Sequence, residues 1–404
     1  MHPGRCRPAR CIGVSRYTVS LVRGAVDVPD FLWAACFGPS LEGRWWYDAL
    51  ERSSLDQFEF AYAVLREGER AVGFAPLFVM DVPLALVVPP VWIPLLNLLG
   101  RVWPALRRQR TLFVGSPCAD EGTVGLLPGI DRAAALACLQ AALVLRAREV
   151  RAPMLVWKDF PASYDDELAA LARASGMFGI DSFPGTAVDL PDSGREGYYA
   201  ALRASHRNKL KRKLKRGEAA LPVDVAVLER PDVAALDEIF ALFWQTYEKA
   251  TTRFERLNRR FFDQISECPP SRFVVLRERT GGRMVAFMLC FLLGGKAINK
   301  FIGIDYRQPA ESFLYFRLWD AAVAWATGEG ARSLQSGQTG YSAKLELEHR
   351  LQPLTNWCVH RNPVLHPVYR LVARSVSWAT LDPDLARHLA AHPEAARGIT
   401  ARPP

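Results

Sequence analysis

The sequence lacks the cysteine and histidine patterns that hold small secreted domains or metal sites together. Its eight cysteines, at positions 6, 11, 36, 118, 138, 268, 290 and 358, form no closely spaced pairs. Its seven histidines show no metal-ligand spacing. A disulfide framework or a zinc site would require such clustering. We therefore expect mostly buried thiols in a reducing compartment and no structural metal.

An uninterrupted apolar segment is also lacking. No apolar region follows the basic residues of 1–16, which argues against a secretory signal. The most apolar stretch, 82–99, is interrupted by prolines at 83, 89, 90 and 94, which disfavour a single lipid-exposed helix. We expect a buried strand and loop there. The alternative is that 92–99, followed by arginines, rests on a membrane surface.

Net charge is nearly absent outside one segment. The chain has 51 basic and 42 acidic side chains, and Arg203–Arg216 supplies eight of the basic ones and no acidic one. Its residues favour a helix, and Gly217 is the expected stop. Such a helix presents cations on most of its circumference. It is either an ordinary solvated surface or a docking surface for a phosphate-rich partner.

The first half of the chain reads as a mixed α/β unit. Residues 1–40 are expected to be irregular. Alternating runs at 58–66 and 71–79 predict a hairpin with a turn at Gly68. Asp131 is placed to cap a helix over 131–150, and further strands are expected at 111–117, 153–157 and 186–190.

The second half predicts a recognisable order of elements. Residues 223–335 read β-α-α-β-β-β-α-β, and glycine pairs at 281–282 and 294–295 make the turns of an antiparallel meander. A helix over 311–327 then leads to a strand at 332–335. Because a helical crossover joins them, this last strand can lie parallel to the third meander strand. A helix at 341–349 and a strand at 354–359 follow.

That order resembles the GNAT acyltransferase fold, and the chain is similar to the FemAB-like branch, whose members carry two GNAT-like halves. The resemblance covers roughly residues 40–362. It rests on four stretches taken together in this order: Phe74–Phe78, Val114–Pro117, Tyr198–Arg212, and Ser336–Lys344 followed by Leu351–Pro353.

The resemblance implies an α/β (α+β) protein with two tandem GNAT-like units, each a mixed, mostly antiparallel sheet flanked by helices. The expected divisions are an irregular segment at 1–40, a first domain at 41–195 and a second domain at 196–362. The second domain opens with the basic linking helix. Residues 363–404 are expected to be a helical, partly disordered tail.

The turn before the 311–327 helix departs from the usual family pattern. Ordinary GNAT enzymes bind the coenzyme A pyrophosphate with a turn that has two glycine positions. The corresponding segment here, Asp305–Glu311, has no glycine at either of them. Backbone amides at this helix start, with Arg307, could still bind an anion. Arg207, Lys209 and Lys211 of the basic helix are further candidates for the donor's phosphates. No tightly bound cofactor is expected; the donor is acyl-CoA or a similar co-substrate.

Three residues are the predicted catalytic groups. Tyr341 and Lys344 are three apart on a predicted helix and so share a face. By the resemblance, Tyr341 protonates the leaving thiolate, and Lys344 could stabilise the oxyanion or orient an anionic group. Asp305, at a strand end, could accept the amine proton. The alternatives are that Tyr341 caps the core, that Lys344 is a surface lysine and that Asp305 is a turn residue.

We therefore predict an N-acyltransferase. It would move an acyl or aminoacyl group from acyl-CoA, an acyl carrier or an aminoacyl-tRNA to an amino group of a small molecule or a cell-envelope precursor. Direct attack, without metal or covalent intermediate, is expected. The alternatives are a nucleic-acid-binding protein that uses the basic helix, or an inactive acyltransferase-like scaffold at a membrane. The expected location is cytoplasmic, with or without peripheral contact at the inner face of the membrane.

Overall fold

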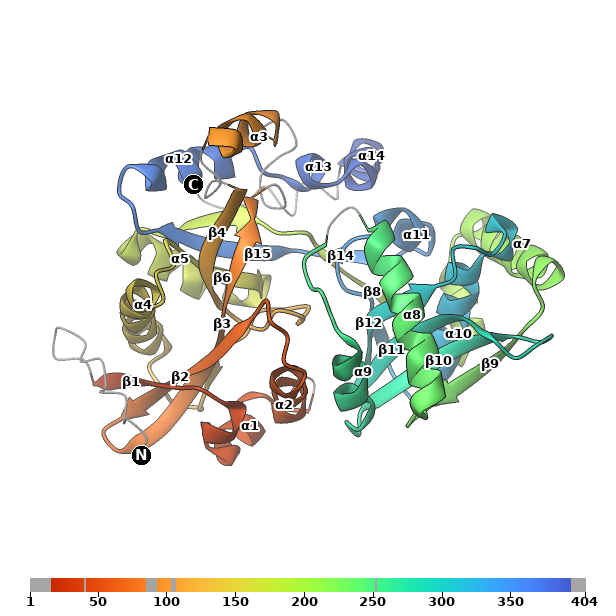
Figure 1. The fold of residues 1–404 in the computed structure, drawn as a ribbon, viewed down its shortest axis with the longest axis horizontal. Coiled ribbons are helices and arrows are strands. Elements are labelled where there is room, and N and C mark those ends of the chain that lie inside the picture. The colour runs from red at the N-terminus through yellow and green to blue at the C-terminus, as the bar shows by residue number, and fades with distance from the viewer. Residues whose placement is uncertain (1–15, 40, 85–92, 103–106, 251–252, 394–404) are drawn as a thin grey trace. The chain divides into compact units, whose positions relative to one another are not determined.

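The chain folds into two compact units, each built on its own sheet (Figure 1). The computed structural model describes residues 16–39, 41–84, 93–102, 107–250 and 253–393. The first unit contains Met1–Gly38, Asp56–Pro184 and Pro353–Pro404, and the second contains Pro39–Leu55 and Gly185–Gln352. In the described residues, each sheet is antiparallel except for one parallel pair of strands. The predicted fold class, two tandem GNAT-like α+β units, is thereby confirmed.

The sheet of the first unit has the strand order β1-β2-β3-β4-β6-β15-β7, with β5 paired to β3. Its strands are β1 (Tyr17–Val22), β2 (Glu59–Glu67), β3 (Arg70–Pro83), β4 (Arg108–Val114), β5 (Gly125–Leu126), β6 (Met154–Pro161), β7 (Phe178–Asp181) and β15 (Leu354–His360). Its helices are α1 (Asp30–Cys36), α3 (Ile93–Val102), α4 (Arg132–Glu149), α5 (Asp165–Ser175), α12 (Leu365–Ala373), α13 (Trp378–Leu381) and α14 (Pro383–Ala391).

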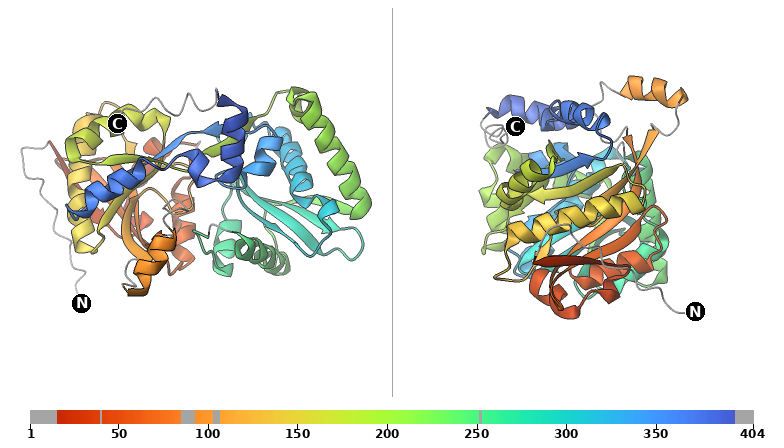
Figure 2. Two further views of the ribbon diagram at one scale, coloured as in Figure 1. Left: turned by 90° about the horizontal axis from the view of Figure 1, so that it is seen from above. Right: turned by 90° about the vertical axis from the view of Figure 1, so that its left-hand side faces the viewer.

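Helix α4 covers one face of this sheet, as the right-hand view of Figure 2 shows. Its first turn is capped as predicted, because the Asp131 carboxylate accepts a hydrogen bond from the backbone N–H of Ala134. Leucines at 136, 139 and 143, spaced three and four residues apart, face the sheet and are buried. The amphipathic pattern therefore fixes how α4 sits on the sheet.

The sheet of the second unit has the strand order β14-β8-β13-β12-β11-β10-β9. Its strands are β8 (Gly185–Asp189), β9 (Val223–Leu228), β10 (Ser271–Glu278), β11 (Met284–Leu293), β12 (Lys296–Ile304), β13 (Ser333–Gln335) and β14 (Arg350–Gln352). Its helices are α2 (Arg44–Arg52), α6 (Gly194–Ala201), α7 (Ala204–Ala220), α8 (Val233–Lys249), α9 (Arg259–Ser266), α10 (Leu314–Gly328) and α11 (Tyr341–Glu346). The predicted meander is β10-β11-β12, and β13 runs parallel to β12 as expected.

Strand β11 is an inner strand of this sheet, between β12 and β10, and is covered on both faces. Met288 and Cys290 belong to the buried cluster that includes α10, whereas the Phe287 ring contacts Phe262 of α9. Alternate residues of a strand point to opposite faces, so an almost continuous apolar run suits this position. Gly303 of β12 lets α8 approach closely, because a Cβ there would lie 2.6 Å from α8 backbone atoms.

The two units differ from the linear domains predicted at 41–195 and 196–362. Strand β8 was assigned to the first domain, but it pairs with β13 and β14 in the sheet of the second unit. Strand β15 was assigned to the second domain, but it lies between β6 and β7 in the first unit. Strand propensity is local, whereas the pairing partner is chosen by long-range packing, which explains the difference.

Several elements also differ from the sequence predictions. Part of the segment 1–40 that was expected to be irregular forms β1 and α1, and residues 93–102, expected in a strand-and-loop region, form helix α3. Residues 85–92 lie outside the described part of the chain, as do 394–404 of the predicted tail. Helix α11 ends at Glu346 rather than 349.

The basic helix α7 continues past its predicted stop at Gly217 to Ala220. Gly217 is helical, and its lack of a side chain allows α7 to approach the carbonyl of Ser312: a Cβ at Gly217 would lie 2.5 Å from that oxygen. Glycine here serves close packing rather than termination.

Candidate functional site

The loop of residues 336–340 joins β13 to α11 and is held closed by Lys344. The Lys344 ammonium donates to the carbonyl oxygens of Ser336, Gly337 and Gln338, the last two at 3.2 Å. The side chain is only 6% exposed, so these charge-assisted bonds form with little competition from water. Lys344 therefore fixes the shape of the loop, as a positioning residue would.

Strands β12 and β13 separate next to this loop. They pair in parallel over Lys296–Ile298 and Ser333–Gln335, and no further pairing between them occurs in the described chain. At the point of separation, buried Asn299 donates from Nδ2 to the Ser336 hydroxyl oxygen at 2.9 Å. We call the edge of β12 beyond Ile298, which has no strand partner in the described residues, the opening; it lies beside this buried polar pair.

Tyr315 of α10 brings a third polar group to this point. Its hydroxyl is buried and lies toward the Ser336 hydroxyl, without the geometry of a hydrogen bond. Burial raises the pKa of Tyr315 well above its usual value, so the phenol stays protonated at neutral pH. Neutral donors of this kind can stabilise negative charge that develops on a carbonyl oxygen.

A bulge in β12 places Lys300 in a buried ion pair. The register between β11 and β12 shifts at Leu289/Cys290, and Lys300 is the extra residue. Its side chain is 1% exposed, and its Nζ lies 2.6 Å from Glu42 Oε1. Burial opposes the charge of Glu42, but Lys300 outweighs burial and lowers the pKa of this carboxyl group. Burial, with the Glu42 charge, raises the pKa of neighbouring Tyr47.

Asp305, one of the predicted catalytic residues, follows β12 and is surrounded by donors. Arg283 Nη1 and Arg307 Nε donate to its carboxylate at 2.7 and 2.8 Å. Burial favours the neutral acid, but the bonds from Arg307, Arg283 and Gln308 outweigh it and hold the pKa of Asp305 well below its usual range. A carboxylate so stabilised is a weak base, so this geometry favours an ion-pair role over proton acceptance.

The predicted phosphate-binding residues divide between two places. Arg307 is exposed and paired with Asp305. Arg207 donates to the carbonyl oxygens of Leu202 and Ala200 at 3.2 and 3.3 Å and thereby caps α6. Lys209 and Lys211 are exposed on α7, where they remain accessible to an anion.

Further along, α7 reaches the start of α10 and the end of α11. The Lys213 ammonium lies 2.7 Å from Glu346 Oε1 of α11 and 3.6 Å from the centre of the Phe316 ring of α10. Arg216 lies over the Phe313 ring, at 5.5 Å. The basic helix is therefore attached to both elements that flank the strand opening.

The structure brings some of the predicted catalytic residues together and separates others. Tyr341 is fully buried, and the Lys344 ammonium lies 6.0 Å from the centre of its ring. Among the described residues, no contact joins this pair to Asp305. The sequence reasoning missed Asn299 and Lys300, although two adjacent polar residues inside an apolar strand were a signal. Glu42 gave no signal at all.

His349 lies behind the lysine loop as a neutral side chain. Burial and the charge of Lys344 lower the pKa of His349 to about 3. Its Nδ1 lies 2.8 Å from the carbonyl oxygen of Lys344 and must carry the hydrogen, because a carbonyl oxygen can only accept. The ring packs on Trp319, with 4.4 Å between ring centres.

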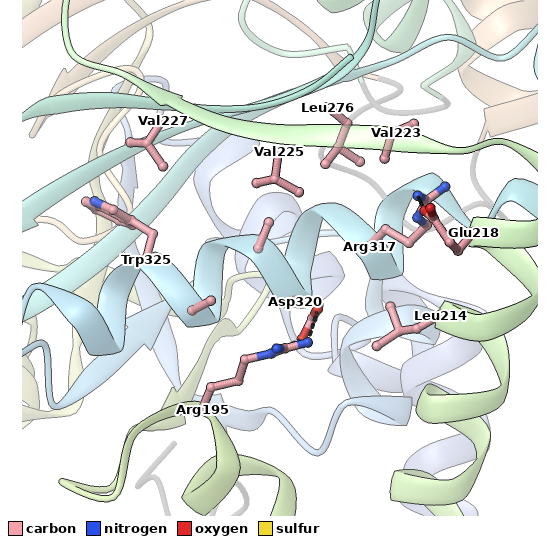
Figure 3. A pocket seen from close by; sticks show the side chains of 12 residues that line it. Arg195, Leu214, Glu218, Val223, Val225, Val227, Leu276, Arg317, Asp320 and Trp325 are labelled. Carbon is pink, nitrogen blue, oxygen red and sulfur yellow. Dashed lines mark hydrogen bonds and ion pairs between the residues drawn. The ribbon is translucent and has the colours of Figure 1, made fainter. Parts of the chain in front are cut away.

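A separate groove of about 510 Å³ runs between α10 and the edge strand β9 (Figure 3). Its charged side chains are paired with each other: Arg195 donates to Asp320 at 2.6 and 2.8 Å, and Arg317 donates to Glu218 at 2.6 Å. The remaining lining is largely apolar. The groove offers apolar contacts, and the indole N–H of Trp325 in its lining has no hydrogen-bond partner among the described residues.

The described ranges contain neither a metal-binding cluster nor a membrane-spanning helix. There, no group of three or more histidine, cysteine or acidic side chains is placed to hold a metal ion. Within the same ranges, every helix is too short or too polar to cross a bilayer.

Comparison with known proteins relates part of the second unit to a known family. Residues 204–342 match the family model of the acetyltransferase (GNAT) domain. The structure is similar to that of FemX, with 12% identity and a TM-score of 0.56 over 88% of this chain and 100% of FemX. It is also similar to a conserved protein of unknown function from Bacteroides thetaiotaomicron, with 11% identity and a TM-score of 0.50 over 84% of this chain and 99% of that one. A search of curated proteins found no match. Residues 204–342 thus match a GNAT domain model, and the chain shares the fold of FemX.

Proposed function

We propose, from the premise that residues 204–342 form a GNAT domain, that the protein is an N-acyltransferase. It moves an acyl or aminoacyl group from an activated donor to an amino group of a small molecule or a cell-envelope precursor. The donor is acyl-CoA, an acyl carrier or an aminoacyl-tRNA. The observation that carries this proposal is the opening between β12 and β13, with buried polar groups at its inner end.

The opening suits an extended donor arm that contains amides. From Asn299 to Gly303, β12 pairs with β11, and the edge turned toward β13 has no strand partner in the described residues. An extended chain can add to such an edge through backbone hydrogen bonds. The pantetheine arm of coenzyme A and of acyl carriers has amide groups that can pair in this way. We therefore assign the donor arm to this edge.

The buried polar groups beside this edge of β12 suit hydrogen bonding to the carbonyl oxygen of the acyl donor. The amine attacks the carbonyl carbon, the new C–N bond forms, and the bond to the leaving sulfur or oxygen breaks. The proton lost by the amine ends on the leaving group. Asn299, Ser336 and Tyr315 are our proposed donors to the oxyanion, because their polar groups are neutral and buried.

The residues predicted from the sequence receive roles that fit their contacts. Tyr341 remains our proposed proton donor to the leaving group; it gives up one proton and regains the proton that the amine loses, so the net transfer is from amine to leaving group. Lys344 acts by holding the loop beside the opening, and Asp305 acts by fixing Arg307. Lys209 and Lys211, together with Arg207 and Arg307, are proposed to attract the donor's phosphates.

The test is consumption of donor with a panel of amines, supplying acetyl-CoA, longer acyl-CoAs and aminoacyl-tRNA in turn. Tyr315→Phe removes only the proposed donor hydroxyl and should lower kcat/KM roughly a hundredfold. Tyr164→Phe is the matched control, because it removes a part-buried phenol hydroxyl in the first unit. If no donor is consumed by the wild type with any amine, the proposal fails.

The exposed cations of α7 support nucleic-acid binding as the second candidate. Lys209, Lys211, Arg212, Lys215 and Arg216 are exposed, so binding would weaken steeply with salt. Titration with DNA and RNA at two salt concentrations separates the candidates. Tight binding without any donor turnover would favour nucleic-acid binding. Neither activity would favour the inactive scaffold.

A further inference from the structure

Helix α12 of the first unit carries a row of exposed apolar side chains. Val364, immediately before the helix, is 73% exposed, and Leu365, Val368 and Leu371 are 41%, 52% and 67% exposed. Spacings of three and four residues place Val364, Val368 and Leu371 on one side of the helix. We call these four residues the outer face of α12. Four large apolar side chains together are unusual on a water-facing helix.

The opposite side of α12 is anchored, so the outer face cannot turn inward by simple rotation. The Tyr369 hydroxyl lies 3.2 Å from Gln109 Oε1, and its ring stacks on His360 with 4.9 Å between centres. His366 accepts a hydrogen bond from the backbone N–H of His360, and its ring packs against Phe178. The orientation of the outer face is therefore a built feature of the first unit.

The segment that carries this face has charge of one sign. The segment 361–381 contains Arg361, Arg370 and Arg374 and no aspartate or glutamate. Arg370 and Arg374 are exposed, and no described carboxylate lies within ion-pair distance of either. Apolar side chains flanked by unpaired arginines match the headgroup and acyl boundary of an anionic bilayer.

Helix α3 lies at the same end of the first unit as α12, in Figure 1 and in the right-hand view of Figure 2. Its Leu98 is 59% exposed, and Arg101 is exposed as well. Arg107 and Arg108, which follow in the chain, are also exposed. Helix α3 thus resembles α12 in having an exposed apolar side chain with exposed arginines close by in the chain.

We propose that the outer face of α12 docks on an anionic lipid bilayer. The valine and leucine side chains enter the acyl boundary, and Arg370 and Arg374 contact lipid phosphates. A second protein copy or a protein partner would need acidic groups opposite these arginines, whereas an anionic bilayer supplies them at every position. This surface lies in the first unit, and its binding requires no acyl donor, so it stands apart from the proposed transferase activity.

The test is sedimentation of the full chain with vesicles of phosphatidylcholine alone and of phosphatidylcholine mixed with phosphatidylglycerol. The wild type should bind the anionic vesicles at low salt and be released by high salt. Arg370→Gln with Arg374→Gln should weaken binding roughly 30-fold, because losing each arginine's attraction to anionic lipid weakens binding about fivefold. Val368→Gln with Leu371→Gln should weaken binding at least about tenfold at low salt.

Matched controls use exposed residues of the second unit. Val233→Gln replaces a valine that is 72% exposed, and Arg230→Gln with Arg332→Gln removes two exposed arginines. Both should bind vesicles as the wild type does. The proposal is overturned if the wild type ignores anionic vesicles or if the controls lose as much binding as the α12 variants. It is also overturned if the apolar α12 variant merely converts an oligomer to a monomer in light scattering, with vesicle binding unchanged.

Discussion

Replacing one partner of the buried Lys300–Glu42 ion pair should destabilise the fold strongly, whereas replacing both partners together should destabilise it much less. Its atoms lie 2.6 Å apart, and the two side chains are 1% and 12% exposed. At an effective dielectric constant of about 20, this distance corresponds to an attraction of about 6 kcal/mol. Removing the two ions from water costs several kcal/mol each. The gain and the cost therefore nearly cancel while both partners are present.

Removing one partner leaves the cost without the gain. We expect Lys300→Met to lower the free energy of unfolding by about 3–5 kcal/mol, because it strands a buried carboxylate. Glu42→Gln should cost a similar amount by stranding the ammonium. The double variant should cost clearly less than the sum of the single changes, giving a coupling energy of about 2 kcal/mol or more.

The assay is urea unfolding of the four proteins in this cycle at matched m-values. Lowering the pH should reduce the cost of Lys300→Met, since the stranded Glu42 can then take up a proton. The exposed Arg146–Glu149 pair serves as a control, and its single variants should each cost less than about 1 kcal/mol. Additive effects within about 0.5 kcal/mol, or a single-variant cost no greater than the control's, would refute the reasoning.

Three further predictions concern the second unit. Lys344→Met should lower stability by about 3 kcal/mol and speed amide exchange in residues 336–340, because it frees three carbonyl oxygens; unchanged exchange would contradict the loop-holding role. In the folded protein His349 takes up a proton only near pH 3, whereas in the unfolded chain it does so near pH 6.5. Its contribution to the free energy of unfolding is therefore complete above pH 6.5 and is lost as the pH falls toward 3. The expected slope, roughly 1 kcal/mol per pH unit, should disappear in unfolding measurements on His349→Gln. Gly303→Ala should cost about 1–3 kcal/mol, since its Cβ would meet α8 backbone at 2.6 Å; an unchanged Tm would argue against this close approach.

Part of the candidate site could be predicted from the sequence. The loop before Tyr341, and the placing of Tyr341 and Lys344 on one face of the helix that follows, come from glycine punctuation and helical spacing, which are local signals. The roles of the side chains could not be predicted in this way. Lys344 bonds to loop carbonyls, and Asp305 is held by two arginines, because of contacts that only the folded chain supplies.

By itself, the sequence determined the elements whose signals are short-range. Apolar periodicity and the Asp131 cap predicted where α4 begins. Apolar runs separated by glycine pairs predicted the β10-β11-β12 meander. Only the tertiary structure decided that β8 joins the sheet of the second unit and β15 that of the first, and that Glu42 pairs with Lys300. Glu42 lies more than two hundred positions from that lysine, so their meeting depends on packing between distant segments, which no local pattern encodes.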